Sequence, residues 1–515
     1  MSEIDNESLK KTSKGTIIAL VGTLAGVLLA FISRVIIARF GMESQYGIFS
    51  LVIVVVNLSV LLATMGITEG ATRYIAYFRA RDETSKIQGT VSASIQLTSL
   101  ASILLSLLLF FTSGIIATKI FHDSGLVLPL RVSAFCIPFL TLTNAFISIF
   151  LGFDSVKENV YFQSILSNLF FLLALVVVAL LGLPFISIFY GYLISAALCT
   201  LVLVLYTVKR LPLKLVSKAS TNLVRKELLL FSLPLLGVAV LQMVISWTAT
   251  LMLGYFKTPD IVGLYNAASP LAQFIFIPMG AMLLIYAPVT SGLYAQNLVP
   301  EIRRNYAILT KWIFSVTLPI FLILLLFPEA VLGFLFGADF IPASQALRIL
   351  SLGYIMVNLL GPNGTTLMAM GKTRFLMWAS MAAAGANVIL NIILIPPLGI
   401  MGAAIATSVS LTLHCIIRHV KVHSTLRVNP LTKNLLKPAI ISIGLISLVS
   451  FLLKSFVDVT FWMLPLLFIL FYAICFMGIL FSRSFDREDI MMLAAIEKRV
   501  GINATPIKKM LKRFL

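Results

Sequence analysis

Long apolar stretches, separated by short polar loops, follow one another from residue 15 to residue 482. A transmembrane helix needs about 20 mainly apolar residues, and about fourteen such segments can be placed. Continuous apolar runs at residues 103–111 and 169–181 exclude transmembrane β-strands, whose apolar and polar residues alternate. The pattern therefore predicts an all-α integral membrane protein with spans at residues 17–40, 46–68, 88–112, 126–150, 160–181, 184–207, 228–254, 262–286, 306–327, 344–370, 375–396, 398–419, 435–453 and 461–481.

Composition supports this prediction. Of the 515 residues, 59% are hydrophobic and only 11% are charged, whereas about a quarter of a soluble domain is charged. All four cysteines, Cys136, Cys199, Cys415 and Cys475, fall within spans. We therefore expect packing cysteines rather than disulfides, and one large helical bundle with no sizeable further domain.

The basic residues indicate the orientation. Most of the 39 lysines and arginines lie on alternate loops, and such residues are retained on the cytoplasmic side. This bias predicts a multi-pass protein of the cell membrane with an even number of spans and both termini in the cytoplasm. The net charge of +19 then reflects topology, and we expect no nucleic-acid partner. The basic tail, residues 482–515, is either an amphipathic strip on the anionic inner leaflet or a solvated tail.

The chain also contains a weak internal repeat. Gly47 is followed by Ile48 and Phe49, and Gly263, 216 positions later, by Leu264 and Tyr265. Each glycine lies in a short outer hairpin between the first two spans of a half. An offset of about six spans returns the chain to its starting side, which predicts two parallel six-helix lobes. The expected parts are a tail (1–16), an N-lobe (17–227), a C-lobe (228–430), spans 13 and 14 (431–481) and the basic tail.

Several motifs resemble those of a known family. Residues 38–50 are similar to the pattern A-R-x-G-x-x-x-Y-G-x-F-S, residues 66–76 resemble a segment ending in R-Y-I-A, and residues 371–407 resemble a C-terminal signature. The resemblance is to the polysaccharide-exporter branch of the multidrug/oligosaccharidyl-lipid/polysaccharide flippase superfamily. It implies two lobes in a V shape plus two extra helices. It also implies a transporter, not an enzyme, that flips polyprenyl-linked (di)phosphate sugars to the outer leaflet for cell-surface glycan assembly.

The same resemblance implies the partners. They are the polyprenyl-linked glycan, membrane lipids, a possible coupling ion, and glycosyltransferases and a polymerase of the same pathway. No cofactor is expected. Two alternatives remain: a multidrug or cation exporter of the same fold, and a membrane glycan polymerase or ligase. The first usually requires carboxylates in the middle of spans, and the second a large outer loop; the sequence predicts neither.

Charges within spans are the main candidate site residues, because each costs about 3 kcal/mol on insertion scales and usually faces a cavity or a partner. Arg34, Arg131 and Arg348 are such charges, and guanidinium groups suit phosphate oxygens. Together with Asn266 they are expected to bind the headgroup. Each arginine also lies near the outer end of its span and could instead extend to the lipid headgroups.

Glu69 and Arg73 close the second span at its cytoplasmic end, on one helix face. We expect them to form a cytoplasmic gate; a local ion pair is the alternative. Amides recur in the spans and could bind sugar hydroxyls or join helices: Asn57, Gln96, Asn144, Gln163, Asn168, Gln242, Asn266, Gln273, Asn358, Asn387 and Asn391. His414, His419 and His423 fit a basic membrane collar better than a metal site.

Overall fold

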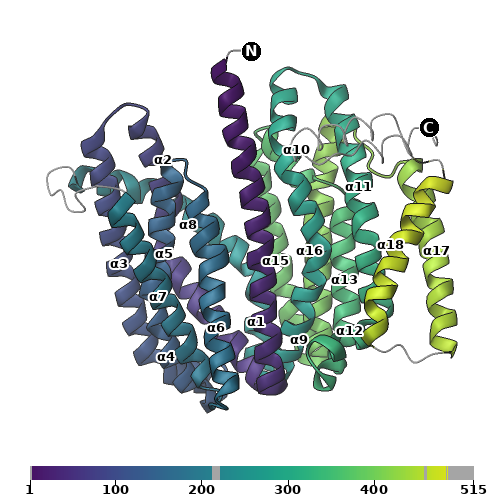
Figure 1. Ribbon diagram of the computed structural model, residues 1–515, viewed down its shortest axis with the longest axis horizontal. Helices are drawn as coiled ribbons and strands as arrows, with labels where there is room; N and C mark the ends of the chain where they lie inside the picture. The colour runs from purple at the N-terminus through teal and green to yellow at the C-terminus, as the bar shows by residue number, and fades with distance from the viewer. Residues whose placement is uncertain (1–2, 211–220, 457–460, 483, 485–515) are drawn as a thin grey trace. The chain divides into compact units, whose positions relative to one another are not determined.

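The structure is a computed structural model that describes residues 3–210, 221–456, 461–482 and 484. These residues form helices joined by short turns and contain no β-strand (Figure 1). Most of the expected basic tail (482–515) and much of the linker between the expected lobes lie outside the described residues.

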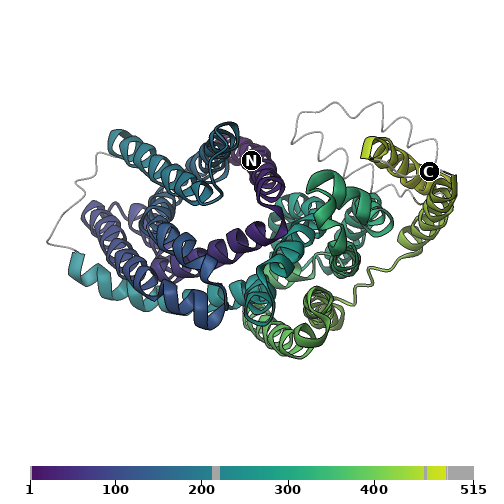
Figure 2. The ribbon, with the colours of Figure 1, turned by 90° about the horizontal axis from the view of Figure 1, so that it is seen from below.

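The chain divides into two compact units, residues 1–263 and 264–515. The first contains α1 (Glu3–Thr64), α2 (Ile67–Arg79), α3 (Thr84–Ile115), the π-helix η1 (Ile116–Ile120), the 3₁₀ turn η2 (Ser124–Leu126), α4 (Val127–Ala134), α5 (Cys136–Gly152), the π-helix η3 (Asn159–Leu166), α6 (Ser167–Leu180), α7 (Ser187–Arg210) and α8 (Thr221–Phe256). It also includes the start of α9 (Pro259–Gln273). Figure 2 views many of these helices close to end-on.

The second unit contains the rest of α9, the 3₁₀ turn η4 (Phe274–Phe276), α10 (Ile277–Ala295), α11 (Val299–Leu326), α12 (Pro328–Leu335), the 3₁₀ segment η5 (Ala338–Ala343), α13 (Ser344–Leu359), α14 (Asn363–Ala369), α15 (Thr373–Leu398), α16 (Ile400–Leu426), α17 (Lys433–Phe456), η6 (Phe461–Met463) and α18 (Leu464–Phe481). Helices α17 and α18 pair with each other and pack on α11. The Tyr472 hydroxyl donates a hydrogen bond to the Val316 carbonyl at 2.9 Å, which ties α18 to α11.

The helices confirm a multi-pass membrane protein. Within the described residues, 12 helices are long and apolar enough to span a membrane, or 13 if the bent pair α4–α5 is one span. The stretch Val21–Arg79 counts once in this total, but the backbone of α1 breaks at Met42 (φ 57°, ψ −174°). This break lies between the first two predicted spans. Every predicted span thus has a helical counterpart, although α1 begins at Glu3, within the expected N-terminal tail.

The compact units divide at a different place from the expected lobes. Helix α8, assigned from the repeat to the second lobe, packs on α1, α2 and α3 of the first unit. The expected lobes describe a sequence repeat, whereas the compact units describe packing, so the lobe boundary after residue 227 stays a prediction.

The interior of the first unit is rich in small hydroxyl side chains. Thr90, Ser94 and Thr98 are fully buried along α3, and Ser94 and Thr98 each donate a hydrogen bond to the carbonyl four residues earlier. Large apolar side chains such as Phe111 and Leu180 are exposed instead. This distribution is expected in lipid, where close helix packing rather than apolar burial holds helices together.

The two repeat glycines contact each other's segments reciprocally. A Cβ at Gly47 would overlap the carbonyl oxygen of Pro259, and a Cβ at Gly263 would overlap the carbonyl oxygen of Glu43. Pro259 and Glu43 are themselves separated by the repeat offset of 216 residues. Two equivalent segments related by a two-fold axis make this kind of contact, so it supports the repeat that the sequence predicts.

The contact requires glycine at both positions. An added Cβ would collide with a backbone carbonyl group, which cannot move aside as a flexible side chain can. We expect Gly47→Ala and Gly263→Ala each to destabilise the protein by about 1–3 kcal/mol through overpacking. Thermal unfolding in detergent would measure this as a lower melting temperature. Gly114→Ala is the matched control, since a Cβ there meets nothing within 4 Å. Equal melting temperatures for all three variants would contradict the contact.

Candidate functional site

A cavity of about 830 Å³, lined by both polar and apolar side chains, lies within the first unit. The second half of α1 and helices α2, α5, η3 and α8 supply its walls. It is lined by Asn57, Val60, Leu61, Thr64, Gly66, Thr68, Glu69, Thr72, Arg73, Asn144, Ile147, Ser148, Leu151, Asn159, Gln163, Ala239, Gln242, Met243, Ser246 and Trp247. Amides, hydroxyls, one carboxylate and one guanidinium thus share a single chamber among membrane-spanning helices.

Two glycines bring α8 close to this chamber. Gly66 has a left-handed backbone (φ 68°) at the break between α1 and α2, and a Cβ there would overlap the Ser232 carbonyl oxygen of α8. One turn later, a Cβ at Gly70 would meet the Ser232 hydroxyl. Small residues four apart allow such backbone approach. The α8 segment that follows then carries Gln242 and Trp247 along the cavity wall.

The two predicted gate residues both line this cavity. The Thr68 hydroxyl donates a hydrogen bond of 2.6 Å to Glu69, and the Arg73 guanidinium lies 4.2 Å from the centre of the Phe231 ring, a cation–π contact. The described contacts of Glu69 and Arg73 include no ion pair between them. Both side chains are exposed, so each charge remains accessible to a bound molecule; their role as a gate stays a prediction.

Some amides in the spans line the cavity, whereas another joins helices. Asn57, Asn144, Gln163 and Gln242 line the cavity, and Gln163 donates a weak hydrogen bond of 3.4 Å to the Asn144 side chain. By contrast, Asn358 is fully buried and donates to the Ile275 carbonyl at 2.7 Å, so it joins helices.

Sequence reasoning missed several lining residues, above all Trp247 and Asn159. A signal for Trp247 was available: Gln242, Ser246 and Trp247 follow helical spacing on one face of α8. Asn159 lies one residue before the predicted span 160–181, whereas the π-helix η3 already begins at Asn159.

The predicted headgroup residues lie elsewhere. Arg34, Arg131, Arg348 and Asn266 are not among the residues that line the cavity. Arg34 is half-buried in the first half of α1. Arg131 is exposed and donates a 3.2 Å hydrogen bond to the Ser113 hydroxyl. Asn266 is 9% exposed in the second unit.

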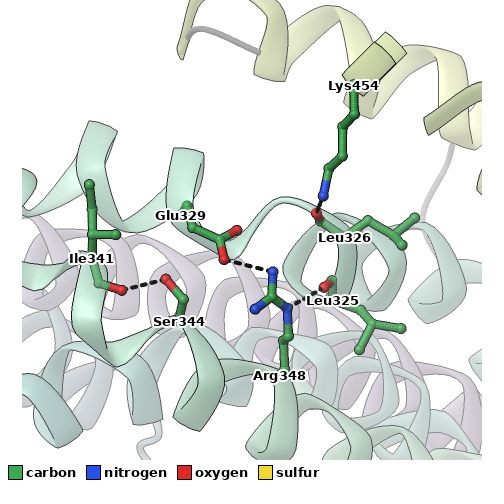
Figure 3. Close-up of polar contacts among 7 residues, drawn as sticks. All are labelled: Leu325, Leu326, Glu329, Ile341, Ser344, Arg348 and Lys454. Carbon is green, nitrogen blue, oxygen red and sulfur yellow. Dashed lines mark hydrogen bonds and ion pairs between the residues drawn. The ribbon is translucent and has the colours of Figure 1, made fainter. Parts of the chain in front are cut away.

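Arg348 has a local partner within the second unit. Its guanidinium forms an ion pair of 2.7 Å with Glu329 and donates a 3.1 Å hydrogen bond to the Leu325 carbonyl at the end of α11 (Figure 3). Lys454 of α17 donates to the next carbonyl, that of Leu326, at 2.6 Å. Cations at a helix C-terminus satisfy carbonyls that lack helical partners. The geometry thus gives Arg348 a stabilising contact, while its role in headgroup binding stays a prediction.

We expect Arg348→Gln to lower the melting temperature, because α11 loses a capping donor and Glu329 loses its partner. A double-mutant cycle with Glu329→Gln should give a coupling of about 0.2–1 kcal/mol, since the side chains are 24% and 44% exposed. Zero coupling would contradict the pairing of Arg348 with Glu329.

Two family models match the chain, one over its first half and one over part of the remainder. The family model described as "Polysaccharide biosynthesis protein" matches residues 12–284, and the model MatE matches residues 234–393. The first match covers more than half of the chain and includes every residue that lines the cavity.

Two archaeal relatives are similar in sequence. "Probable low-salt glycan biosynthesis flippase Agl15" of Haloferax volcanii is 27% identical over 172 residues, 33% of this chain and 36% of that protein. "Uncharacterized membrane protein MJ1068" of Methanocaldococcus jannaschii is 24% identical over 426 residues, 77% of this chain and 81% of that protein. The chain thus matches about a third of the length of the first relative and most of the second.

Solved structures show the same fold. "Lipid II flippase MurJ, inward closed conformation" has a TM-score of 0.70 at 18% identity and covers 92% of this chain and 100% of its own. An "inward-facing conformation of a multidrug resistance MATE family transporter" has a TM-score of 0.63 at 15% identity over 80% of this chain and 98% of its own. At these identities the likeness establishes the all-α membrane fold alone.

Proposed function

Because the chain belongs to the polysaccharide biosynthesis protein family, in the oligosaccharide flippase branch of its superfamily, we propose that it flips a polyprenyl-linked sugar or oligosaccharide. Transport would run from the inner to the outer leaflet by alternating access, without chemical change to the cargo. The cavity of the first unit carries this proposal. A saccharide headgroup cannot cross hydrocarbon unaided, and this cavity offers it hydrogen-bonding groups.

The cavity chemistry fits a phosphorylated saccharide. The amides and hydroxyls of Asn57, Asn144, Gln163 and Gln242 and their neighbours can exchange hydrogen bonds with sugar hydroxyls. The Trp247 ring offers an apolar surface for one face of a sugar ring. Arg73 supplies a cation suited to phosphate oxygens. The cavity volume also falls within the range of about 300–1,000 Å³ typical of small-molecule sites.

The membrane potential would favour this direction of transport. We infer that the protein lies in the cell membrane with both termini in the cytoplasm, as the charge bias predicts. Moving one negative charge out of a negative cytoplasm then releases about 2.3 kcal/mol per 100 mV. An anionic (di)phosphate cargo would therefore move outward without a nucleotide-binding domain.

A leaflet-transfer assay in reconstituted vesicles would test the proposal. A fluorescent polyprenyl-linked saccharide should reach the opposite leaflet in a protein-dependent way, as measured with a membrane-impermeant quencher. Losing a charged hydrogen bond costs about 1.5–3 kcal/mol. We therefore expect Arg73→Gln to slow transfer about ten-fold or more. Trp247→Ala should also slow transfer, because the sugar ring loses an apolar surface.

Trp378→Ala is the matched control. Trp378 is 62% exposed on α15 and does not line the cavity, so this variant should retain wild-type transfer. Equal rates for the cavity variants and the control would reject the cavity as the transport site. Export of cationic dyes without saccharide transfer would instead support the multidrug exporter.

Headgroup binding by Arg34, Arg131, Arg348 and Asn266 is a separate part of the proposal. For the three arginines it is supported by the cost of placing a charge within a span. We expect Arg34→Ala to reduce transfer while the melting temperature is retained, because no stabilising ion pair is described for Arg34. Unchanged transfer in both Arg34→Ala and Arg348→Ala would reject a basic headgroup site.

A further inference from the structure

Two opposite charges lie in the cavity without pairing with each other. Glu69 and Arg73 are the only ionisable residues among the described residues that line it, and both side chains are exposed. They are four residues apart on α2, about 6 Å along the helix axis. A carboxylate and a guanidinium at this spacing commonly form an ion pair, yet the described contacts include none between them. The cavity therefore presents a separate negative and positive position.

The negative position is held in place by two neighbouring hydroxyl groups. The Thr68 hydroxyl donates a hydrogen bond of 2.6 Å to Oε2 of Glu69. The Thr72 hydroxyl donates one of 3.0 Å to the Ser148 carbonyl of α5, across the cavity wall. The first contact orients the carboxylate, and the second fixes its turn of α2 against α5.

The positive position is held by aromatic rings of two helices. The Arg73 guanidinium lies over the Phe231 ring of α8, 4.2 Å from its centre. The Tyr74 ring packs edge-on against the same ring at 5.7 Å. A guanidinium stacked on a ring keeps N–H donors in its plane for oxygen ligands. Arg73 can thus bind a phosphate without leaving this contact.

The separation of the two charges has a consequence for the cargo. This step rests on the proposed function, in which Arg73 binds the phosphate of a lipid-linked saccharide. The sugar attached to that phosphate then lies within reach of Glu69, one helical turn away. We propose that Glu69 is a specificity-determining residue: it selects a cargo whose phosphate-proximal sugar is neutral or cationic, and it excludes one in which that sugar is a uronic acid.

The chemistry of a carboxylate supports this selection. An ionised carboxylate only accepts hydrogen bonds, so hydroxyl and ammonium groups of a sugar can bind to it, whereas a second carboxylate is repelled. With Arg73 engaged by the phosphate, no other cation among the described lining residues can compensate that repulsion. The remaining polar groups of the lining are neutral amides and hydroxyls. Repulsion is also stronger in a cavity than in bulk water, because the effective dielectric constant is lower.

Leaflet transfer of two matched cargoes tests the selection. Polyprenyl-diphosphate-linked glucose and glucuronic acid differ only at C6, a hydroxymethyl group in the first and a carboxylate in the second. The membrane potential is set to zero, so that the additional charge gains no driving force. We expect the wild type to transfer the glucose cargo about ten-fold faster or more, because like charges in contact at a binding site are strongly unfavourable. Equal rates, or faster transfer of the glucuronic acid cargo, would overturn the inference.

Variants of the carboxylate separate its charge from its shape. Glu69→Gln removes the charge but keeps a side-chain oxygen that can accept from Thr68, and it should transfer the two cargoes at nearly equal rates. Glu69→Asp retains the charge and should still favour glucose. Glu227→Gln is the matched control, because Glu227 is exposed on α8 and does not line the cavity; it should keep the wild-type preference. An unchanged preference in Glu69→Gln would contradict the assigned role.

Soluble sugar phosphates distinguish this inference from transport itself. In a variant whose other three tryptophans are replaced by phenylalanine, the fluorescence of Trp247 reports binding in the cavity. Glucose 1-phosphate should bind more tightly than glucuronic acid 1-phosphate, and Glu69→Gln should remove most of the difference. If neither lipid-linked cargo is transferred, the proposed function fails and this binding preference decides the inference. Absence of the preference would then overturn it.

Discussion

Lipid cannot solvate polar groups, and most features of this molecule follow from that constraint. The backbone is helical because only internal hydrogen bonds satisfy it. Side-chain hydroxyls along α3 turn back to their own helix, and the cations Arg348 and Lys454 cap the exposed end of α11. Several polar side chains of the first unit likewise gather around a cavity instead of facing hydrocarbon.

The same constraint explains why the spans could be predicted from sequence. Hydropathy and length suffice where each helix must cross about 30 Å of hydrocarbon, and the break at Met42 falls in a predicted hairpin. The grouping of helices could not be predicted in this way. Packing of α8 on the first unit depends on close contact at Gly66 and Gly70, which neither hydropathy nor the repeat reveals.

The residues that line the cavity could be predicted only in part, because the sequence does not reveal which helices pack together. Glu69 and Arg73 stand out as a charged pair at a span end, and they do line the cavity. Arg348 stands out equally, yet its partner Glu329 lies 19 positions away and becomes evident only in three dimensions.

The mutual contact of Gly47 and Gly263 bears on how such a chain could arise. If the two halves descend from a duplicated ancestor, the same patch on each copy would have been self-complementary, as in an isologous homodimer. Fusion of the two copies would then make their association independent of protein concentration. It would also free the two halves to diverge, so that α2 and η3 could acquire cavity residues without matching changes in the other half.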